Sequence, residues 1–99
     1  MNVRIHAVHF NAAASLLDRV QQKIDKLPGY SRSIVDVNVF LKLDNLAHHI
    51  KDKVVEIRVH VPRGDLFVKS CSKSFEQSFE KAYHSLLTQI KKRKEKQQP

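Results

Sequence analysis

An alternating run of side chains between residues 33 and 43 constrains the fold of this chain more than any other feature. The aliphatic members of the run share one side of an extended backbone: Val35, Val37, Val39, Leu41 and Leu43. Asp36, Asn38 and Lys42 share the other side, with Phe40 as an exception there. A period of two is typical of a strand that buries one face and leaves the other in water. The run therefore predicts a sheet whose apolar face must be covered by other elements.

Three shorter segments alternate in the same way and predict the rest of this sheet. The first covers residues 2–8 and the second covers residues 55–61. After the second, a Pro-Arg-Gly-Asp turn sequence at 62–65 precedes a short strand over residues 66–72. The polar stretch 44–53 predicts a loop between the long strand and the one that follows it.

Apolar residues at helical spacing predict two helices. The first is expected over residues 12–26, with Asn11 as its N-cap and a Pro-Gly pair at its end. Its apolar stripe consists of Leu16, Leu17, Val20, Ile24 and Leu27. The second is expected over residues 74–94, with Ser72 or Ser74 as its cap. Its apolar stripe consists of Phe75, Phe79, Ala82, Tyr83, Leu86, Leu87 and Ile90.

The element order is therefore β-α-β-β-β-α, which predicts an α+β fold. Four strands form one sheet, both helices pack on its apolar face, and its other face stays polar. Residues 1–94 are expected to form a single domain, since a chain of 99 residues is close to the usual domain size of about 100–150. Residues 95–99 are expected to form a disordered basic tail.

The chain is strongly basic, with 18 Lys and Arg residues against 10 Asp and Glu, a net charge of +8 and a pI of about 9.9. Residues 73–99 hold seven of the basic and three of the acidic residues, which is half of the excess. A small domain with such an excess is typical of a protein that meets a polyanion. Nucleic acid is the first candidate, and an anionic membrane surface is the second.

The basic residues of the two helices are the candidate contacts. At the end of the second helix, five of the six positions from 91 to 96 are Lys or Arg. About two or three cations suffice to complement a helix dipole, so a cluster that contacts phosphates explains this number better. The candidate RNA-binding residues are Lys91, Lys92, Arg93 and Lys94 at this end, Lys81 on the flank of the same helix, and Arg19, Lys23 and Lys26 on the first helix.

The solvent-facing side of the sheet is not expected to stack nucleobases. Phe40 is the only aromatic residue expected on it, whereas base-stacking sheets carry about two or three exposed aromatics on adjacent strands. His6 and His60 fall on the same side, where they allow a weak contact with nucleic acid. This pattern favours recognition of phosphates and shape in a structured RNA.

No catalytic, metal or cofactor site is expected. The six histidines, which include the pair His48 and His49, lack the spacing of metal ligands. Cys71 has no second cysteine as a partner, and we expect it to be buried near the end of the sheet. Gly29 and Gly64 are the only glycines and each suits a turn, so a Gly-rich phosphate loop is missing. We therefore expect neither enzyme activity nor a small-molecule substrate.

The start of the chain and its hydropathy predict a cytoplasmic location. The first residues lack the apolar stretch of a signal peptide. An apolar run of about 18 residues, which a transmembrane helix requires, is missing as well. We therefore expect no membrane partner.

Five segments, taken in order, carry a resemblance to a known family. They are Val3-Arg4-Ile5-His6, Leu16-Leu17, Val39-Phe40-Leu41-Lys42-Leu43, Val59-His60-Val61-Pro62-Arg63-Gly64-Asp65-Leu66 and Gln89-Ile90-Lys91-Lys92-Arg93-Lys94. In this set the chain resembles the ribosome hibernation-promoting factors, also described as ribosome-associated inhibitors or sigma-54 modulation proteins, in their short form. The resemblance extends over essentially the whole chain.

The resemblance implies a fold similar to a double-stranded-RNA-binding domain and a role without catalysis. It implies binding to the small ribosomal subunit in the channel for tRNA and mRNA, with contacts to 16S-type rRNA. Translation would be inhibited, and idle ribosomes would be preserved in stationary phase or stress. By position, the basic helix end of the family corresponds to Lys91, Lys92, Arg93 and Lys94, and Lys23, Lys26 and Lys81 are similar in role.

Two other interpretations stay open. One is a general module for structured RNA, such as a double-stranded-RNA binder, although here an extra strand precedes the first helix. The other is a protein-binding modulator of transcription, although the sequence offers no exposed apolar patch to a protein partner.

Overall fold

The computed structural model describes the backbone of residues 1–45 and 51–97 and the side chains of residues 1–44 and 53–93. The elements are β1 (Asn2–Val8), α1 (Ala14–Ile24), a 3-10 turn η1 (Leu27–Gly29), β2 (Asp36–Asn45), β3 (Lys51–His60), β4 (Leu66–Ser72) and α2 (Phe75–Gln97). The predicted order β-α-β-β-β-α and the α+β fold are confirmed.

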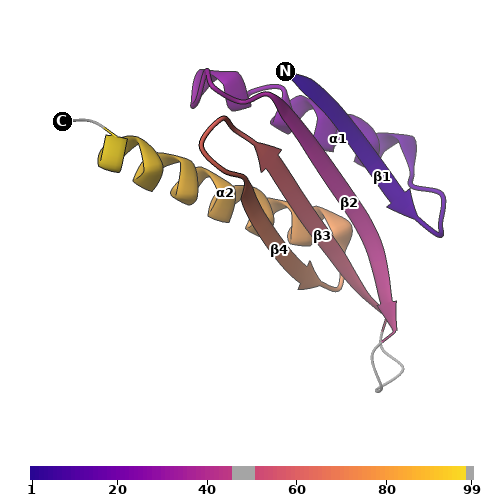
Figure 1. Ribbon diagram of the computed structural model, residues 1–99. Helices are drawn as coiled ribbons and strands as arrows, with labels where there is room; N and C mark the ends of the chain where they lie inside the picture. The colour runs from indigo at the N-terminus through magenta and orange to yellow at the C-terminus, as the bar shows by residue number, and fades with distance from the viewer. Residues whose placement is uncertain (46–50, 98–99) are drawn as a thin grey trace.

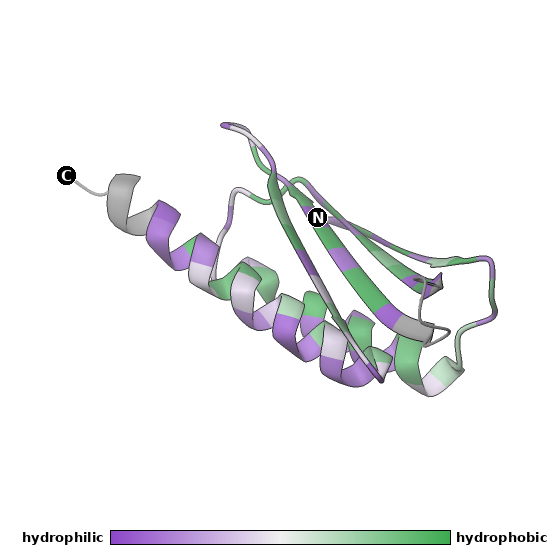
Figure 2. Cartoon of the chain, turned by 90° about the horizontal axis from the view of Figure 1, so that it is seen from below, coloured by the Kyte–Doolittle hydropathy of each residue, from purple (hydrophilic) through white to green (hydrophobic). Residues whose placement is uncertain are grey.

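The four strands form one mixed sheet in the order β1-β2-β3-β4. β1 runs parallel to β2, while the β2–β3 and β3–β4 pairs are antiparallel. A parallel pair needs a crossover connection, and α1 supplies it. Both helices lie behind the sheet in Figure 1 and on the same side of it when seen from below in Figure 2. No element of the described residues covers the opposite side of the sheet, here called the open face.

The alternation of the sequence is the reason for this layering. The sheet residues turned toward the helices are fully buried: Val37, Val39, Leu41, Val55, Ile57 and Val59. They pack in one core with the apolar stripes of the helices, including Val20 and Ile24 of α1 and Phe79 and Leu86 of α2. Burial of each such side chain contributes about 1.5–3 kcal/mol to folding, so the apolar face fixes where both helices lie.

The N-terminal cap of α1 is not the predicted one. Ala13 occupies the cap position without a side-chain hydrogen bond, so the expectation for Asn11 is wrong and the helix is shorter than 12–26. The ring of Phe10 stacks on that of Phe75, with a centroid distance of 5.0 Å. Ala13 itself has an extended backbone, so the helix starts only at Ala14. At α2, Ser74 accepts a hydrogen bond from the backbone N–H of Gln77 at 3.2 Å, as one of the two predicted caps.

The long strands extend beyond their apolar runs. β2 starts at Asp36 and continues to Asn45, where it still pairs with Lys51 of β3. The predicted loop over 44–53 is therefore shorter, because backbone pairing needs no apolar side chain. α2 continues to Gln97, and residues 98 and 99 of the expected tail lie outside the described residues, as do His48 and His49.

Truncation of Phe79 to Ala should cost about 3–5 kcal/mol of unfolding free energy, because this ring is only 1% exposed and its removal leaves a cavity in the core. Phe67→Ala is the matched control, since that ring is 46% exposed. It should cost about 1 kcal/mol or less, the worth of an exposed contact between a ring and a cation. Urea unfolding followed by circular dichroism measures both. Equal losses in the two variants would contradict this placement of the core.

Candidate nucleic-acid interface

The structure brings two of the predicted contact residues of α1 together with an acidic residue of α2. Arg19 donates to Glu80, with 3.2 Å from Nη2 to Oε1, and Lys23 lies beside the same carboxylate at 3.9 Å from Nζ to Oε2. All three side chains are more than a third exposed, so water and salt screen these ion pairs. Glu80 neutralises one of the two cations, which leaves this flank of the helices less basic than the sequence suggests.

Tyr83 holds the end of α1 against α2. Its hydroxyl donates to the backbone carbonyl of Lys23 at 3.0 Å, and the Lys23 ammonium lies 5.6 Å from the centroid of its ring. Burial raises the pKa of the Tyr83 phenol, and the neighbouring Tyr30 and Glu80 raise it further. The neutral hydroxyl is thus kept as a donor, and it fixes the spacing between the basic residues of the two helices.

The exposed lysines of α2 lie in two rows. Lys91 follows Glu80 by eleven positions, about three helical turns, so both lie on the flank that faces α1. Lys92 follows Lys81 by the same interval, which places these two on the outward flank. Among the described side chains, no carboxylate pairs with any of these three lysines. Lys81, Lys91 and Lys92 are therefore available to bind a polyanion.

Two other predicted residues extend this surface in different ways. Lys26 is exposed and lies just after α1, at the start of η1. The side chain of Lys94 lies outside the described residues, although its backbone belongs to α2.

Arg93 has a structural contact that sequence reasoning did not foresee. It is half-buried, and its Nη1 donates to the carbonyl of Gly64 in the turn between β3 and β4 at 3.0 Å. Gly64 has φ of 121°, a conformation that side chains with a Cβ rarely adopt. The bond ties the C-terminal half of α2 to this turn.

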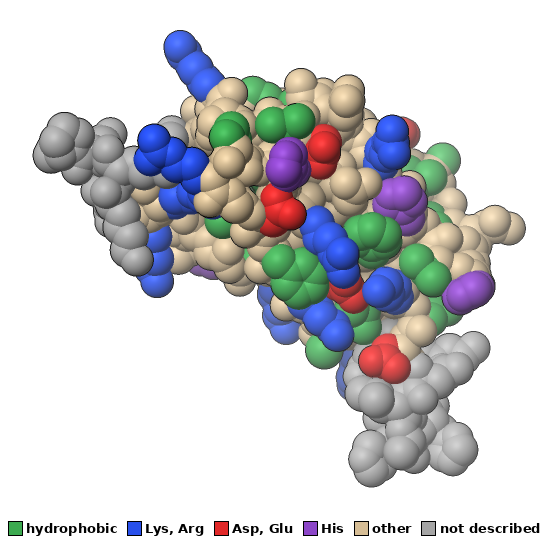
Figure 3. All heavy atoms as spheres, viewed as in Figure 1, with side chains coloured by type: hydrophobic (Ala, Val, Ile, Leu, Met, Phe, Trp, Pro, Cys, Tyr) green, Lys and Arg blue, Asp and Glu red, His purple; other side chains and the backbone are tan. Residues whose placement is uncertain are grey.

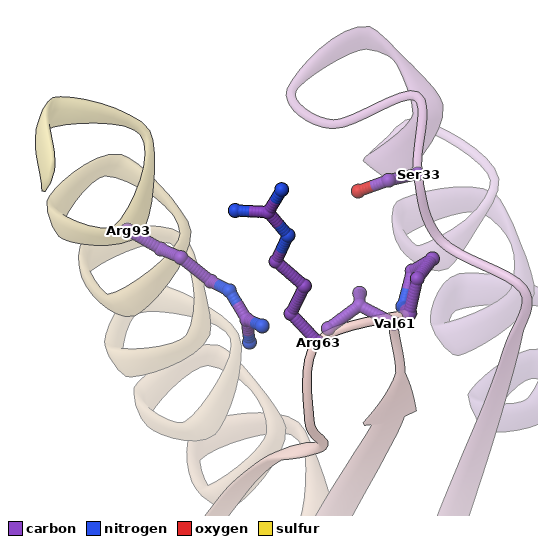
Figure 4. A pocket seen from close by; sticks show the side chains of 5 residues that line it. Ser33, Val61, Arg63 and Arg93 are labelled. Atoms are coloured by element: carbon purple, nitrogen blue, oxygen red, sulfur yellow. The ribbon is translucent and has the colours of Figure 1, made fainter. Parts of the chain in front are cut away.

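A cavity of about 320 Å³ opens between α2 and the β3–β4 turn, lined by Ser33, Val61, Pro62, Arg63 and Arg93. Figure 4 shows the guanidinium groups of Arg63 and Arg93 pointing into the same space, with Ser33 on its other side. The lining contains two guanidinium groups and a hydroxyl but no carboxylate among the described residues. Such a set suits an oxyanion such as a backbone phosphate. Arg63 is thus a candidate contact that the sequence analysis missed, because it interpreted residues 62–65 only as a turn.

The open face of the sheet differs from the expectation. Phe67 points to it and is 46% exposed, so the prediction of Phe40 as its only aromatic residue is wrong. In β4 it pairs opposite Arg58, while its neighbour Val68 is buried in the core. Cys71 is exposed rather than buried, because its position in β4 follows the same alternation.

The histidines expected on this face are held by neighbours. His6 shares a hydrogen bond of 3.2 Å with the amide oxygen of Asn38, and Nδ1 of His60 lies 2.6 Å from a carboxylate oxygen of Asp65. In the described part of the chain, no three His, Cys, Asp or Glu side chains come close enough to hold a metal ion. None of the described helices combines the length and apolar character that a membrane span requires.

Comparison with known proteins places this geometry in context. The sequence model of the sigma 54 modulation protein / S30EA ribosomal protein family matches residues 3–98. The fold is similar to that of a ribosomal subunit interface protein from Coxiella burnetii, with a TM-score of 0.82, 17% identity, and coverage of 95% of this chain and 98% of the other. The fold is also similar to that of the N-terminal domain of Thermus thermophilus Protein Y, with a TM-score of 0.77 and 24% sequence identity. That match covers 93% of this chain and 98% of the other. No curated protein matches the chain in sequence.

The raised pKa of Tyr83 predicts a loss of stability at alkaline pH. A phenol whose folded pKa lies above its unfolded value of about 10 stabilises the fold below that value, and this contribution fades as the pH rises through the folded pKa. Tyr83→Phe removes the donor to Lys23 and should cost about 1 kcal/mol at neutral pH. Urea unfolding across the alkaline range should show the gap to wild type shrinking above about pH 10. A gap that stays constant with pH would contradict this role of the hydroxyl.

Proposed function

We propose a function from one premise: the chain belongs to the sigma 54 modulation protein / S30EA ribosomal protein family, a family of ribosome-associated modulation proteins. The proposal is that the protein inhibits translation by binding the small ribosomal subunit in the channel for tRNA and mRNA. It holds idle ribosomes in an inactive state and acts in the cytoplasm, where its partner is found. Its ligand is 16S-type rRNA, and no chemical step, cofactor or small-molecule substrate is involved.

The unpaired cations along the helices are the observation that carries this proposal. Lys81, Lys91 and Lys92 have no carboxylate partner among the described side chains. The cavity between the β3–β4 turn and α2 adds the guanidinium groups of Arg63 and Arg93. Each cation that meets a phosphate releases a counterion, which is the main source of affinity for nucleic acid. Cations spread over several helical turns suit a folded RNA better than a single phosphate ligand.

The shape supports a mechanism of occupancy. The domain measures 50 × 26 × 18 Å along its principal axes, and α2 extends past the sheet at its C-terminal end (Figure 1). An elongated body with cations at one end can enter a channel lined by RNA and exclude other ligands by its volume. We propose that the domain over 1–94 fills the channel, and that the end of the chain, where α2 continues to Gln97, follows it.

The ion pairs rank the proposed contacts. Lys91 and Lys92 are the principal ones, with Lys81 and Lys26 beside them, because they are exposed and form no ion pair among the described side chains. Lys94 belongs to the same helix end by sequence. Arg19 and Lys23 contribute less, because they share the carboxylate of Glu80. Arg93 positions the β3–β4 turn and contributes one side of the anion cavity.

Lys91→Gln should weaken binding to the small subunit several-fold and lower the slope of log K against log salt by about one unit, the effect of one lost phosphate contact. Lys73→Gln is the matched control, because Lys73 is also exposed but precedes the other end of α2. It should leave the slope unchanged. Fluorescence anisotropy of labelled protein titrated with purified small subunits measures both variants.

The same titration with an RNA duplex of unrelated sequence distinguishes the general RNA-binding module. Binding to this duplex as tight as to the subunit would favour that module over the ribosome-specific role. Equal slopes for Lys91→Gln and wild type would remove Lys91 from the interface.

Glu80→Gln should tighten binding to the small subunit, because it releases Arg19 and Lys23 from their shared carboxylate. The salt slope should rise, while the unfolding free energy should change by about 1 kcal/mol or less, as for exposed ion pairs. Glu76→Gln is the matched control, because it makes the same change of charge one turn earlier on α2. In the described structure Arg19 and Lys23 form ion pairs with Glu80 and not with Glu76. A larger gain from Glu76→Gln than from Glu80→Gln would contradict the proposed role of this flank.

A further inference from the structure

The open face of the sheet carries a compact group of rings and cations. Figure 3 looks onto this face and shows hydrophobic and Lys or Arg side chains side by side at its centre. Two phenylalanines belong to it, Phe40 on β2 and Phe67 on β4, with Arg58 on the strand between them. The Arg58 guanidinium carbon lies 5.5 Å from the centroid of the Phe40 ring and 5.4 Å from that of Phe67. This group lies on the side of the sheet opposite the helices.

A buried carboxylate holds the cations of this group in place. The Glu56 side chain is only 8% exposed, and it accepts a hydrogen bond from Lys42 at 2.9 Å. Arg58 lies 3.9 Å from its other oxygen. Lys42 in turn lies 5.6 Å from the centroid of Phe40. The group is therefore arranged before any ligand arrives, which lowers the entropic cost of binding.

The two rings are occupied to different degrees. The imidazole of His6 stacks on Phe40 at a centroid distance of 4.8 Å and an angle of 14° between the planes. Phe67 is contacted by Arg58 but stays 46% exposed. An exposed aromatic ring beside a guanidinium is the type of surface on which nucleobases stack.

A hollow of about 280 Å³ lies beside this ring, lined by Arg58, Asp65, Leu66 and Phe67. Its apolar wall comes from Leu66 and Phe67, and its polar wall from Arg58 and Asp65. One oxygen of the Asp65 carboxylate is used by His60, at 2.6 Å from Nδ1. The other oxygen remains available to accept a hydrogen bond from a ligand.

We propose that this hollow binds one unpaired nucleobase of a single-stranded RNA segment. The base stacks on Phe67, Arg58 and Lys69 neutralise the adjoining phosphates, and Asp65 accepts a hydrogen bond from an amino group of the base. Charge selects RNA over a protein partner. Lys42 and Arg58 lie beside the rings, and Lys69 lies two positions after Phe67 in β4, on the same face and opposite Glu56. Glu56 is buried, and Asp65 is the exposed carboxylate of the hollow. The inference deepens the proposed function, on which it rests, by giving the protein a second RNA contact on the face away from the helices.

A short single-stranded oligonucleotide tests this site. The probe is a fluorescein-labelled oligocytidylate, whose bases each carry an amino donor that a carboxylate can accept. An abasic ribose-phosphate chain of the same length and label serves as the comparison. Anisotropy titrations at low salt should show that oligocytidylate binds tighter than the abasic chain to the wild-type protein.

Phe67→Ala should weaken binding of oligocytidylate about tenfold, which corresponds to ~1.4 kcal/mol for one lost stacking contact, and leave the abasic chain unaffected. Phe67→Tyr should restore most of the loss, because a tyrosine ring stacks equally well. Val35→Ala is the matched control, since Val35 is similarly exposed at 47% and lies outside the group. Circular dichroism of each variant checks that the fold is intact.

Two results would overturn the site: equal binding of oligocytidylate and the abasic chain, or equal binding of wild type and Phe67→Ala. Small-subunit binding by wild type, measured in parallel, separates this inference from the proposed function. Subunit binding without a Phe67 effect on the oligonucleotide would remove the site and leave the ribosomal role in place. If Phe67→Ala weakens oligocytidylate binding while the wild type does not bind the small subunit, the site stands and the proposed function is contradicted.

Discussion

The valines and leucines on one face of β2 and β3 can be kept from water only by helices on that same face. Both helices therefore lie side by side on one layer, and their polar flanks become neighbours. The apolar stripe of α2 ends at Ile90, while the helix continues to Gln97, and the sequence from 91 to 97 contains no apolar residue. Most residues in this last part of the helix are Lys or Arg. Burial of the sheet thus decides where the cations of the chain are displayed.

The same constraint leaves the two sides of the molecule with different chemistry. The helix side offers cations in rows, spaced by Tyr83 and Glu80, and an arginine cavity at its end. The open face offers rings with cations fixed above a buried glutamate. The first side suits phosphates in a folded RNA, and the second suits an unpaired base. A domain with both can meet RNA on two sides at once, which the proposed binding in a channel lined by RNA requires.

The sequence predicted the features that rest on periodicity, because burial of one face leaves a repeating trace in the residues. The four strands, two helices and their order could be read in this way, and so could the exposed lysines at the end of α2. Phe67 could not, because Leu66, Phe67 and Val68 are three apolar residues in a row and give no alternation. The register with β3 decides that the middle one faces outward.

The features that depend on packing left no trace in the sequence. Arg19 and Glu80 are 61 positions apart, so only the packing of the two helices brings them together. Arg63 and Arg93 meet for the same reason, because the β3–β4 turn lies against α2. Asn11 is not the cap because α1 starts only at Ala14, after the segment in which Phe10 packs against the core.

Sedimentation of the full chain with purified small ribosomal subunits through sucrose gradients tests the ribosomal role most directly. We expect the protein to travel with the subunits at low salt and to leave them as the salt concentration rises, because the contacts are ionic. A protein that stays at the top of the gradient at low salt would contradict this role.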